Sequence, residues 1–229
     1  MPRKRQEALR EATFEDIKAA ARTLMGEKGT AGLSMRGIAR QLDLTAPALY
    51  YYYGSLDDLI TALIYEDYHA LADVMEAARE SSRAQSPADQ LTFVLNAYRQ
   101  WALDHPVDFM LISGNPIPGY DAPGELTTPA AARVLAVPTD VIADGLAAGE
   151  FKLPPEALDL PESIAYALQQ VAAERGYNTP VGAVYLAVSG WTQINGLVSL
   201  ELYNATQPVV GDTGAFFAHR MQALIDSMR

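Results

Sequence analysis

The chain contains no cysteine and only three histidines among its 229 residues. Without cysteine, disulfides and thiol chemistry are excluded, and a reducing cytoplasm is the simplest compartment for the protein. Glu66 and His69 have the Glu-x-x-His spacing of helical metal sites, but no second pair of this kind accompanies them. We therefore interpret these two residues as part of a solvated helix face and expect no metal site.

The signatures of common catalytic sites are also missing. The sequence has no G-x-x-x-x-G-K-[ST] phosphate loop and no G-x-G-x-x-G fingerprint. Ser189 lacks the G-x-S-x-G context of a nucleophilic serine. We predict that the protein is not an enzyme and needs no cofactor.

Basic residues are scarce, because 17 lysines and arginines are set against 28 acidic residues, for a net charge of −11. This total argues at first against a nucleic-acid partner, but the charges are unevenly placed. Residues 1–54 carry nine basic and six acidic side chains, a balance of +3, whereas residues 55–229 carry eight and twenty-two, a balance of −14. The asymmetry fits a DNA-reading head on an acidic body, although ordinary variation of surface charge is the alternative.

The sequence has no alternating strand pattern of useful length and no internal repeat, so we predict an all-helical fold. Hydrophobic residues make up 49% of the chain, which is enough for a sizeable core. The most apolar stretch, residues 183–202, is long enough to span a bilayer, but it carries Gln193, Asn195 and Glu201 and lacks a basic flank. We predict no membrane span, and no secretory signal, because no apolar run follows the basic start of the chain.

Residues 34–59 organise the rest of the chain. Ser34 and Thr45 are suitable N-caps for two short helices, and Pro47 falls in the first turn of the second helix, where a missing N–H costs little. A helix, a tight turn and a second helix led by small residues form a helix-turn-helix, whose second helix fits the DNA major groove. The spacing alone leaves both DNA binding and plain helical packing open.

The same stretch resembles the TetR family of bacterial transcriptional regulators. The resemblance is carried by GLSMRGIAR at residues 32–40 and by LTAPALYYYYGSLDDL at residues 44–59, which is similar to the family phrase V-S-x-x-x-L-Y-x-H-F-x-S-K-x-x-L. A weaker similarity lies at residues 191–196, WTQING, which resembles a W-x-x-x-H-G phrase of some members with Asn195 in place of the histidine. The resemblance implies an N-terminal three-helix helix-turn-helix domain and a larger helical ligand-binding and dimerisation domain.

The resemblance also implies which side chains contact DNA. Those near base edges would be Thr45, Ala46, Pro47, Ala48 and Tyr51, and those near phosphates would be Ser34, Arg36, Tyr50 and Tyr52. Alanine and proline side chains cannot hydrogen-bond to bases, so specificity is expected to depend on thymine methyl groups, on Thr45, Tyr51 and Arg36, and on DNA shape. Leu49 and Tyr53 are expected to pack inside the small domain.

Two positions depart from the family pattern. Tyr52 stands where the family often has histidine, and Leu56 stands where it often has lysine. Tyrosine can still donate a hydrogen bond to phosphate. Leucine cannot, so we expect one phosphate contact fewer per subunit and weaker binding at high salt.

Three regions are expected along the chain. Residues 1–12 are polar and charged and are interpreted as a mobile arm, in which Arg3, Lys4 and Arg5 either lie near DNA or belong to a solubilising tail. Residues 13–54 form the helix-turn-helix DNA-binding domain, whose first helix covers residues 13–28. Residues 55–229 form the helical ligand-binding and dimerisation domain.

The larger region should contain helices over residues 55–81, 87–105, 107–113, 129–149, 161–175, 180–204 and 213–228. Residues 114–128 are rich in glycine and proline and are predicted to form a loop, which either covers a pocket or has no fixed structure. Pro138 is expected to kink or break the helix that contains it.

The helix predicted over residues 180–204 is apolar nearly all round, so it must bury two faces. One face can serve its own core and the other a partner subunit, with Gly190 and Gly196 allowing close approach. A helix central to a large monomer is the alternative. The resemblance implies that this helix and the one over residues 213–228 build a four-helix homodimer interface.

A small-molecule pocket in the larger domain is also implied by the resemblance. Its candidate residues are aromatic, soft and polar side chains of the middle helices: Tyr98, Trp101, Phe109, Met110, Tyr166, Trp191, Gln193 and Asn195. A mostly apolar pocket with few polar groups suits a hydrophobic or aromatic effector. Taken singly, each apolar residue is more often core than ligand contact.

The sequence therefore predicts a cytoplasmic, ligand-responsive, DNA-binding transcriptional regulator. We expect a repressor that binds a near-palindromic operator on double-stranded DNA as a homodimer. The alternative is a helical scaffold or protein-binding module without DNA readout, which Leu56 and the acidic total charge favour. Salt dependence separates the two, because DNA binding weakens steeply with salt.

Overall fold

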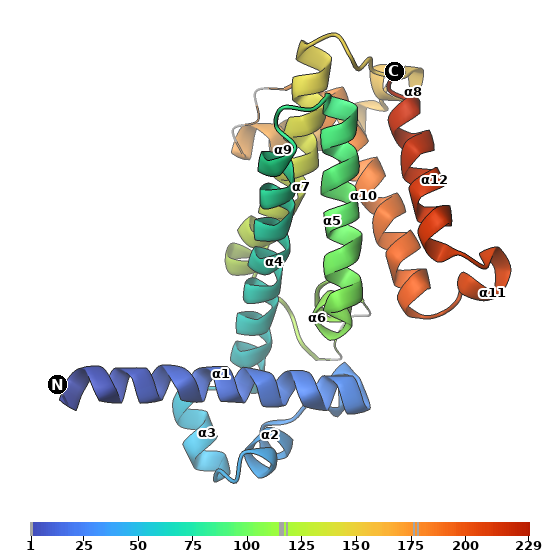
Figure 1. Cartoon of the computed structure of the whole chain (residues 1–229). Helices are drawn as coiled ribbons and strands as arrows, with labels where there is room; N and C mark the ends of the chain where they lie inside the picture. The colour runs from blue at the N-terminus through green and yellow to red at the C-terminus, as the bar shows by residue number, and fades with distance from the viewer. Residues whose placement is uncertain (1, 115–116, 118, 176, 178) are drawn as a thin grey trace. The chain divides into compact units, whose positions relative to one another are not determined.

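The structure is a computed structural model that describes residues 2–114, 117, 119–175, 177 and 179–229. The described residues are helical without any strand, which confirms the predicted all-helical fold. Figure 1 shows the elements, which in chain order are α1 (Pro2–Lys28), the 3-10 helix η1 (Thr30–Gly32), α2 (Met35–Gln41), α3 (Ala46–Tyr52), α4 (Leu56–Ser81), α5 (Pro87–Asp104), α6 (Pro106–Ser113), α7 (Gly124–Ala147), α8 (Pro155–Leu158), α9 (Glu162–Glu174), α10 (Val181–Leu202), α11 (Gln207–Val210) and α12 (Thr213–Asp226).

The chain divides into two compact units. The first, called the head unit below, consists of Met1–Asp67 and His105–Pro129, and the second, called the body unit, consists of Tyr68–Asp104 and Ala130–Arg229. Helix α4 contributes residues to both units, and α6 belongs to the head unit although it follows α5 in the chain.

The head unit is built around the apolar stripe of α1. Ile17 and Ala21 are fully buried there. Helix α2 packs on α1 and on α3, and Ile38 of α2 and Leu49 of α3 are fully buried as well. Leu59 of α4 is also fully buried. Burial of large aliphatic side chains contributes roughly 1.5–3 kcal/mol each, so these short helices depend on packing more than on their own helical propensity.

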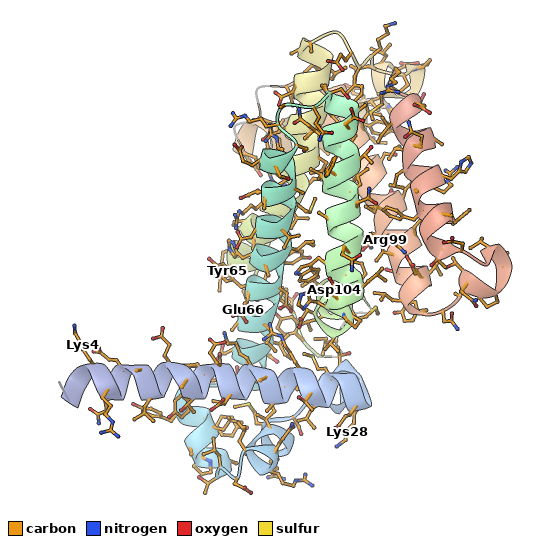
Figure 2. All side chains as sticks on the ribbon, viewed as in Figure 1. Lys4, Lys28, Tyr65, Glu66, Arg99 and Asp104 are labelled. Atoms are coloured by element: carbon orange, nitrogen blue, oxygen red, sulfur yellow. The ribbon has the colours of Figure 1, made fainter. Side chains whose placement is uncertain are left out.

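The body unit is a bundle in which α5, α10 and α12 run side by side (Figure 1). Figure 2 shows Arg99 of α5 on the side of the bundle where α10 and α12 lie. Its Nη2 and Nε lie 2.6 and 2.9 Å from the two carboxylate oxygens of Glu201 on α10. Glu201 also accepts a 2.6 Å hydrogen bond from the Thr213 hydroxyl at the start of α12. This mostly buried pair therefore joins the three helices.

Helices α1 and α7 differ from the sequence predictions. Helix α1 begins at Pro2 rather than near residue 13, so residues 2–12 continue the helix instead of forming a separate arm. Their glutamine, glutamate, alanine, leucine and arginine residues are good helix formers. The side chains of residues 4–12 are exposed, so no apolar periodicity marked this part of the helix.

Helix α7 begins at Gly124, inside the segment predicted to be a loop, and it continues through Pro138 to Ala147. Proline removes one backbone hydrogen bond from a helix. Val134, Val137, Val141 and Ile142 are all buried around this point, and their packing offsets the lost bond. Residues 115, 116 and 118 of the predicted loop lie outside the described residues.

The predicted C-terminal helices are present with bounds shifted by one to two residues, as α9, α10 and α12, and the short helices α8 and α11 lie between them. Among the described residues, no helix, α10 included, combines the length and the apolar character needed to cross a membrane.

Candidate DNA-binding surface and ligand cavity

Helices α2 and α3 form the predicted helix-turn-helix, and both N-caps are made as the sequence indicated. The Ser34 hydroxyl accepts a 3.2 Å hydrogen bond from the Gly37 N–H, and the Thr45 hydroxyl accepts a 3.3 Å bond from the Ala48 N–H. Asp43 makes the turn between them with a φ of 53°, a left-handed conformation that aspartate tolerates better than most residues. The Leu44 N–H then donates back to the Ala39 carbonyl at 2.9 Å and fixes the turn.

Helix α3 has one face exposed to solvent and one face packed against the rest of the head unit. On the packed face, the side chain of Leu49 is fully buried, as predicted. Tyr50 is 50% exposed and Tyr51 is 72% exposed, although tyrosines commonly bury most of their ring. Among the other predicted DNA contacts, Ser34, Arg36, Thr45 and Pro47 are exposed, whereas Ala46, Ala48 and Tyr52 are half-buried. The N-terminal end of α3 is therefore open for an approach by DNA.

An aromatic cluster joins α1 to α3. The Phe14 ring meets Tyr52 and Tyr53 edge to face, with ring centroids 5.2 and 5.4 Å apart, and Tyr52 meets Tyr51 in the same way at 5.4 Å. Arg10, one turn before Phe14 on α1, places its guanidinium carbon 5.5 Å from the Phe14 centroid and 5.9 Å from the Tyr51 centroid. Arg10 was not among the residues predicted to contact DNA; its i, i+4 spacing from Phe14 is a local signal that favours this ring contact.

A charged cluster lies deeper in the head unit. Arg22 of α1 donates from Nη2 to Asp67 at 2.6 Å and to Glu66 at 3.1 Å, and from Nε to Asp108 of α6 at 2.6 Å. Lys18 donates to Glu66 at 2.6 Å. Burial raises the pKa of Asp67 to about 7, and the neighbouring Asp108 carboxylate adds to this rise while Arg22 opposes it. Burial also acts to raise the pKa of Glu66, but hydrogen bonds from Lys18 and Arg22 outweigh it and lower that pKa.

Glu66 and His69, which have the spacing of a helical metal site, interact with different side chains. Glu66 pairs with Lys18 and Arg22 in the head unit, while Nδ1 of His69 lies 3.0 Å from Nη1 of Arg133 in the body unit. Within the described ranges, no group of three or more potential ligands of the His, Cys, Asp or Glu type is placed to hold a metal ion.

The body unit contains an apolar cavity with a volume of about 30 Å³. Five helices line it, through residues that include Met75, Leu95, Tyr98, Val134, Pro138, Leu186, Ala187, Trp191, Ile194, Leu224 and Met228. Tyr98 is 2% exposed, and its hydroxyl donates a 3.1 Å hydrogen bond to the side-chain oxygen of Asn195. Since one water needs about 10–15 Å³ of such space, the cavity in this state admits little more than two waters.

Of the eight residues predicted to contact a ligand, Tyr98 and Trp191 line this cavity. Asn195 adjoins it through its bond to Tyr98, Gln193 donates to the Ser189 carbonyl at 3.5 Å, and Trp101 is buried. The other three lie elsewhere: Tyr166 is 64% exposed on α9, and Phe109, which is fully buried, and Met110 belong to α6 in the head unit.

One side of α10 is left exposed in a single chain. Trp191, Leu200 and Tyr203 are 42%, 47% and 55% exposed, and Thr192 and Gly196 lie between them at helical spacing. On α12, Ala215, Ala218 and His219 are also exposed. Both helices therefore carry apolar or small residues facing solvent.

Two family descriptions match the sequence. Residues 17–63 match the family described as "Bacterial regulatory proteins, tetR family", and residues 91–224 match "Tetracyclin repressor-like, C-terminal domain". The two matches together cover the helix-turn-helix and most of the helices that follow it.

Curated relatives match along nearly the whole chain. The HTH-type transcriptional regulator Rv1816 of Mycobacterium tuberculosis (strain ATCC 25618 / H37Rv) is 31% identical over 223 residues, which are 97% of this chain and 94% of the relative. The HTH-type transcriptional regulator Mb1846 of Mycobacterium bovis (strain ATCC BAA-935 / AF2122/97) matches with the same identity and coverage.

Solved structures show the same fold. The crystal structure of the regulatory protein SCO4313 aligns with a TM-score of 0.77 at 30% identity and covers 96% of this chain and 98% of that one. The structure of RolR (NCGL1110) in complex with resorcinol aligns with a TM-score of 0.53 at 14% identity and covers 95% of this chain and 89% of RolR. At that identity the likeness to RolR shows the fold alone.

Proposed function

The chain belongs to the TetR family of transcriptional regulators, and we propose that it is a repressor that binds a near-palindromic operator as a homodimer. In this proposal, binding of a small apolar or aromatic effector releases the repressor from the operator. As a member of that family it is a DNA-binding regulator and not an enzyme. The observation that carries the proposal is the pair of capped helices α2 and α3. Leu49 packs α3 into the core of the head unit, and the N-terminal end of α3 is exposed to solvent. We place the protein in the cytoplasm, where such an operator would be found.

DNA readout is assigned to the exposed end of α3. Thr45 and Tyr51 can hydrogen-bond to base edges, while Ala46, Pro47 and Ala48 can only make apolar contacts, for which thymine methyl groups are the partners. Ser34, Arg36, Tyr50 and Tyr52 are assigned to phosphates. Tyr52 reaches DNA less easily than the others, because its ring is half-buried against Phe14.

Dimerisation is assigned to α10 and α12. The exposed stripe on α10 follows the helix at spacings of three to five residues and combines large apolar side chains with Gly196, which allows a partner helix to approach closely. A two-fold interface of this kind would place two recognition helices on half-sites separated by about one turn of DNA, roughly 34–36 Å.

The effector site is assigned to the apolar cavity, with Tyr98 and Trp191 as aromatic contacts and Asn195 as a polar anchor. A cavity of about 30 Å³ cannot hold a ligand without rearrangement, so binding requires its lining helices to shift. That requirement supports regulation, because a ligand that binds one arrangement better than another shifts the population toward it. RolR, which shares the fold, was crystallised with resorcinol, a small aromatic compound of the class proposed here.

The test begins with selection of bound fragments from a genome-wide DNA pool, followed by fluorescence anisotropy on the selected sequence across a salt series. We expect sequence-selective binding whose affinity falls steeply with salt. A panel of small aromatic compounds should then contain at least one that releases the operator. Binding no tighter than to random DNA would overturn the proposed operator readout, and selective binding that no compound relieves would argue against the effector-controlled repressor.

A further inference from the structure

Arg10 on α1 has an environment that differs from that of the other basic residues near the start of the chain. Its guanidinium lies over two aromatic rings, Phe14 on its own helix and Tyr51 on α3, at 5.5 and 5.9 Å from the centroids. Both distances fall within the range of cation–π attraction, which is about 6 Å. The exposed Arg10 therefore connects the N-terminal part of α1 to the recognition helix.

We propose that Arg10 is a positioning residue for DNA recognition, which holds the exposed Tyr51 side chain in one orientation and directs its own remaining N–H donors to the phosphate beside the base that Tyr51 contacts. This inference rests on the proposed operator readout by α3. It adds a contact from outside the helix-turn-helix, because Arg10 lies more than twenty residues before α2.

Tyr51 is the side chain that most needs such support. It is 72% exposed, more than Tyr50 at 50%. A side chain in that position normally samples several rotamers and loses this freedom when it binds. Here two contacts restrain it, the edge of the Tyr52 ring at 5.4 Å and the Arg10 guanidinium. Restraint before binding reduces the entropy that DNA binding must remove.

The Arg10 guanidinium also has N–H donors available for a phosphate. A guanidinium carries five N–H donors in a planar fork that suits phosphate. Across the described residues no carboxylate forms an ion pair with Arg10, whereas Lys18 and Arg22 farther along α1 are committed to acidic partners. Stacking on a ring uses the face of the guanidinium and leaves its edge available. Arg10 can therefore contact Tyr51 and a phosphate at the same time.

A purely structural role is the competing explanation, because Arg10 and Phe14 could simply stabilise the packing of α1 on α3. The two explanations differ in what each variant changes. A structural role predicts a loss of folding stability that is independent of Tyr51. A positioning role predicts that the effect on DNA affinity depends on Tyr51 being present.

The test compares Arg10→Ala, Tyr51→Ala and the double variant on the selected operator. The matched control is Lys4→Ala, because Lys4 is an exposed basic residue near the start of the same helix (Figure 2), and no ring of the described residues forms a cation–π contact with it. We expect Arg10→Ala to weaken operator binding by roughly tenfold and Lys4→Ala to weaken it less. In the double variant, the total loss of operator affinity should be clearly smaller than the product of the two single losses. Arg10→Lys should keep the salt dependence of the wild type but recover affinity only in part. Equal effects of Arg10→Ala and Lys4→Ala, or independent effects of Arg10→Ala and Tyr51→Ala, would overturn the inference.

A measurement without DNA separates this inference from the proposed function. In protein with labelled tyrosine rings, Arg10→Ala should shift and narrow the Tyr51 resonance as the ring becomes mobile, while thermal unfolding of the variant stays within a few degrees of the wild type. If the wild type fails to select an operator, the proposed readout is wrong whatever Tyr51 does. If the operator is selected and the Tyr51 resonance is unchanged in the variant, the positioning role is wrong.

Discussion

Arg22 on α1 donates a 2.6 Å hydrogen bond to Oδ1 of Asp67 on α4, yet Oδ2 of the same carboxyl has no hydrogen-bond partner among the described residues. The guanidinium is shared with Glu66 and Asp108, so one cation serves three carboxylates in the head unit. Asp67 is the most deeply buried of the three, at 2% exposure. Its charged form is therefore the least well compensated, which explains why burial raises its pKa to about 7.

The raised pKa makes head-unit stability depend on pH near neutrality. The folded state holds a proton on Asp67 below about pH 7, whereas the unfolded chain holds it only below its ordinary pKa of 3.8. The contribution to stability therefore grows as the pH falls through 7. Relative to Asp67→Asn, which cannot titrate, the wild type should gain about 1 kcal/mol of unfolding free energy between pH 8 and pH 6. Urea denaturation of both proteins at the two pH values measures this difference, and parallel pH dependences would show that Asp67 does not titrate between pH 6 and pH 8.

The pair of Arg99 and Glu201 is expected to be important for the body unit. Their side chains are 18% and 12% exposed, and the hydrogen bond from Arg99 is the main reason that the pKa of Glu201 is lowered. Arg99→Ala should cost about 2–4 kcal/mol of unfolding free energy, because it leaves a mostly buried carboxylate without its partner. Arg83→Ala is the matched control, since its pair with Glu80 is over 70% exposed on both sides and should cost at most about 1 kcal/mol. Similar losses in the two variants, measured by chemical denaturation, would contradict the assignment.

The local parts of the fold could be predicted from sequence, because local chemistry determines them. Ser34 and Thr45 cap their helices through bonds that span only three residues, and these caps were predicted from residue type and spacing. The start of α1 could not be located in this way. Residues 4–12 are exposed all round, so their helix follows from propensity and carries no apolar periodicity.

The candidate sites depend on tertiary contacts that spacing does not specify. Tyr98 and Trp191 lie 93 positions apart and line one cavity, whereas Tyr166, chosen for the same aromatic character, is exposed on α9. The contact of Arg10 with Tyr51 likewise requires α1 to pack on α3. Continuation of α7 through Pro138 also depends on tertiary packing, since buried neighbours offset a local defect.

Leu56 offers a direct test of the missing phosphate contact. It is the first residue of α4 and is half-buried, and Asp57 and Asp58 follow it. Leu56→Lys should add about one phosphate contact per subunit, so the slope of log affinity against log salt should steepen by about 0.9 per contact, or roughly two for a dimer. Leu56→Gln is the control, because it is polar without charge. If the lysine variant keeps the wild-type slope, the new ammonium group is bound by the neighbouring aspartates and does not reach DNA.

Filling the cavity should prevent the effector from binding while leaving operator binding intact. Ala187 lines the cavity and is 2% exposed, so Ala187→Leu would occupy much of the remaining space, with a stability loss of about 1–3 kcal/mol from overpacking. The variant should still bind the selected operator, because Ala187 belongs to the body unit and DNA readout is assigned to α3. Compounds that release the wild-type operator complex should fail to release the variant at the same concentrations. Ala173→Leu, on the exposed side of α9, is the control and should respond like the wild type. Unchanged release of Ala187→Leu, measured by anisotropy alongside that control, would place the effector site outside this cavity.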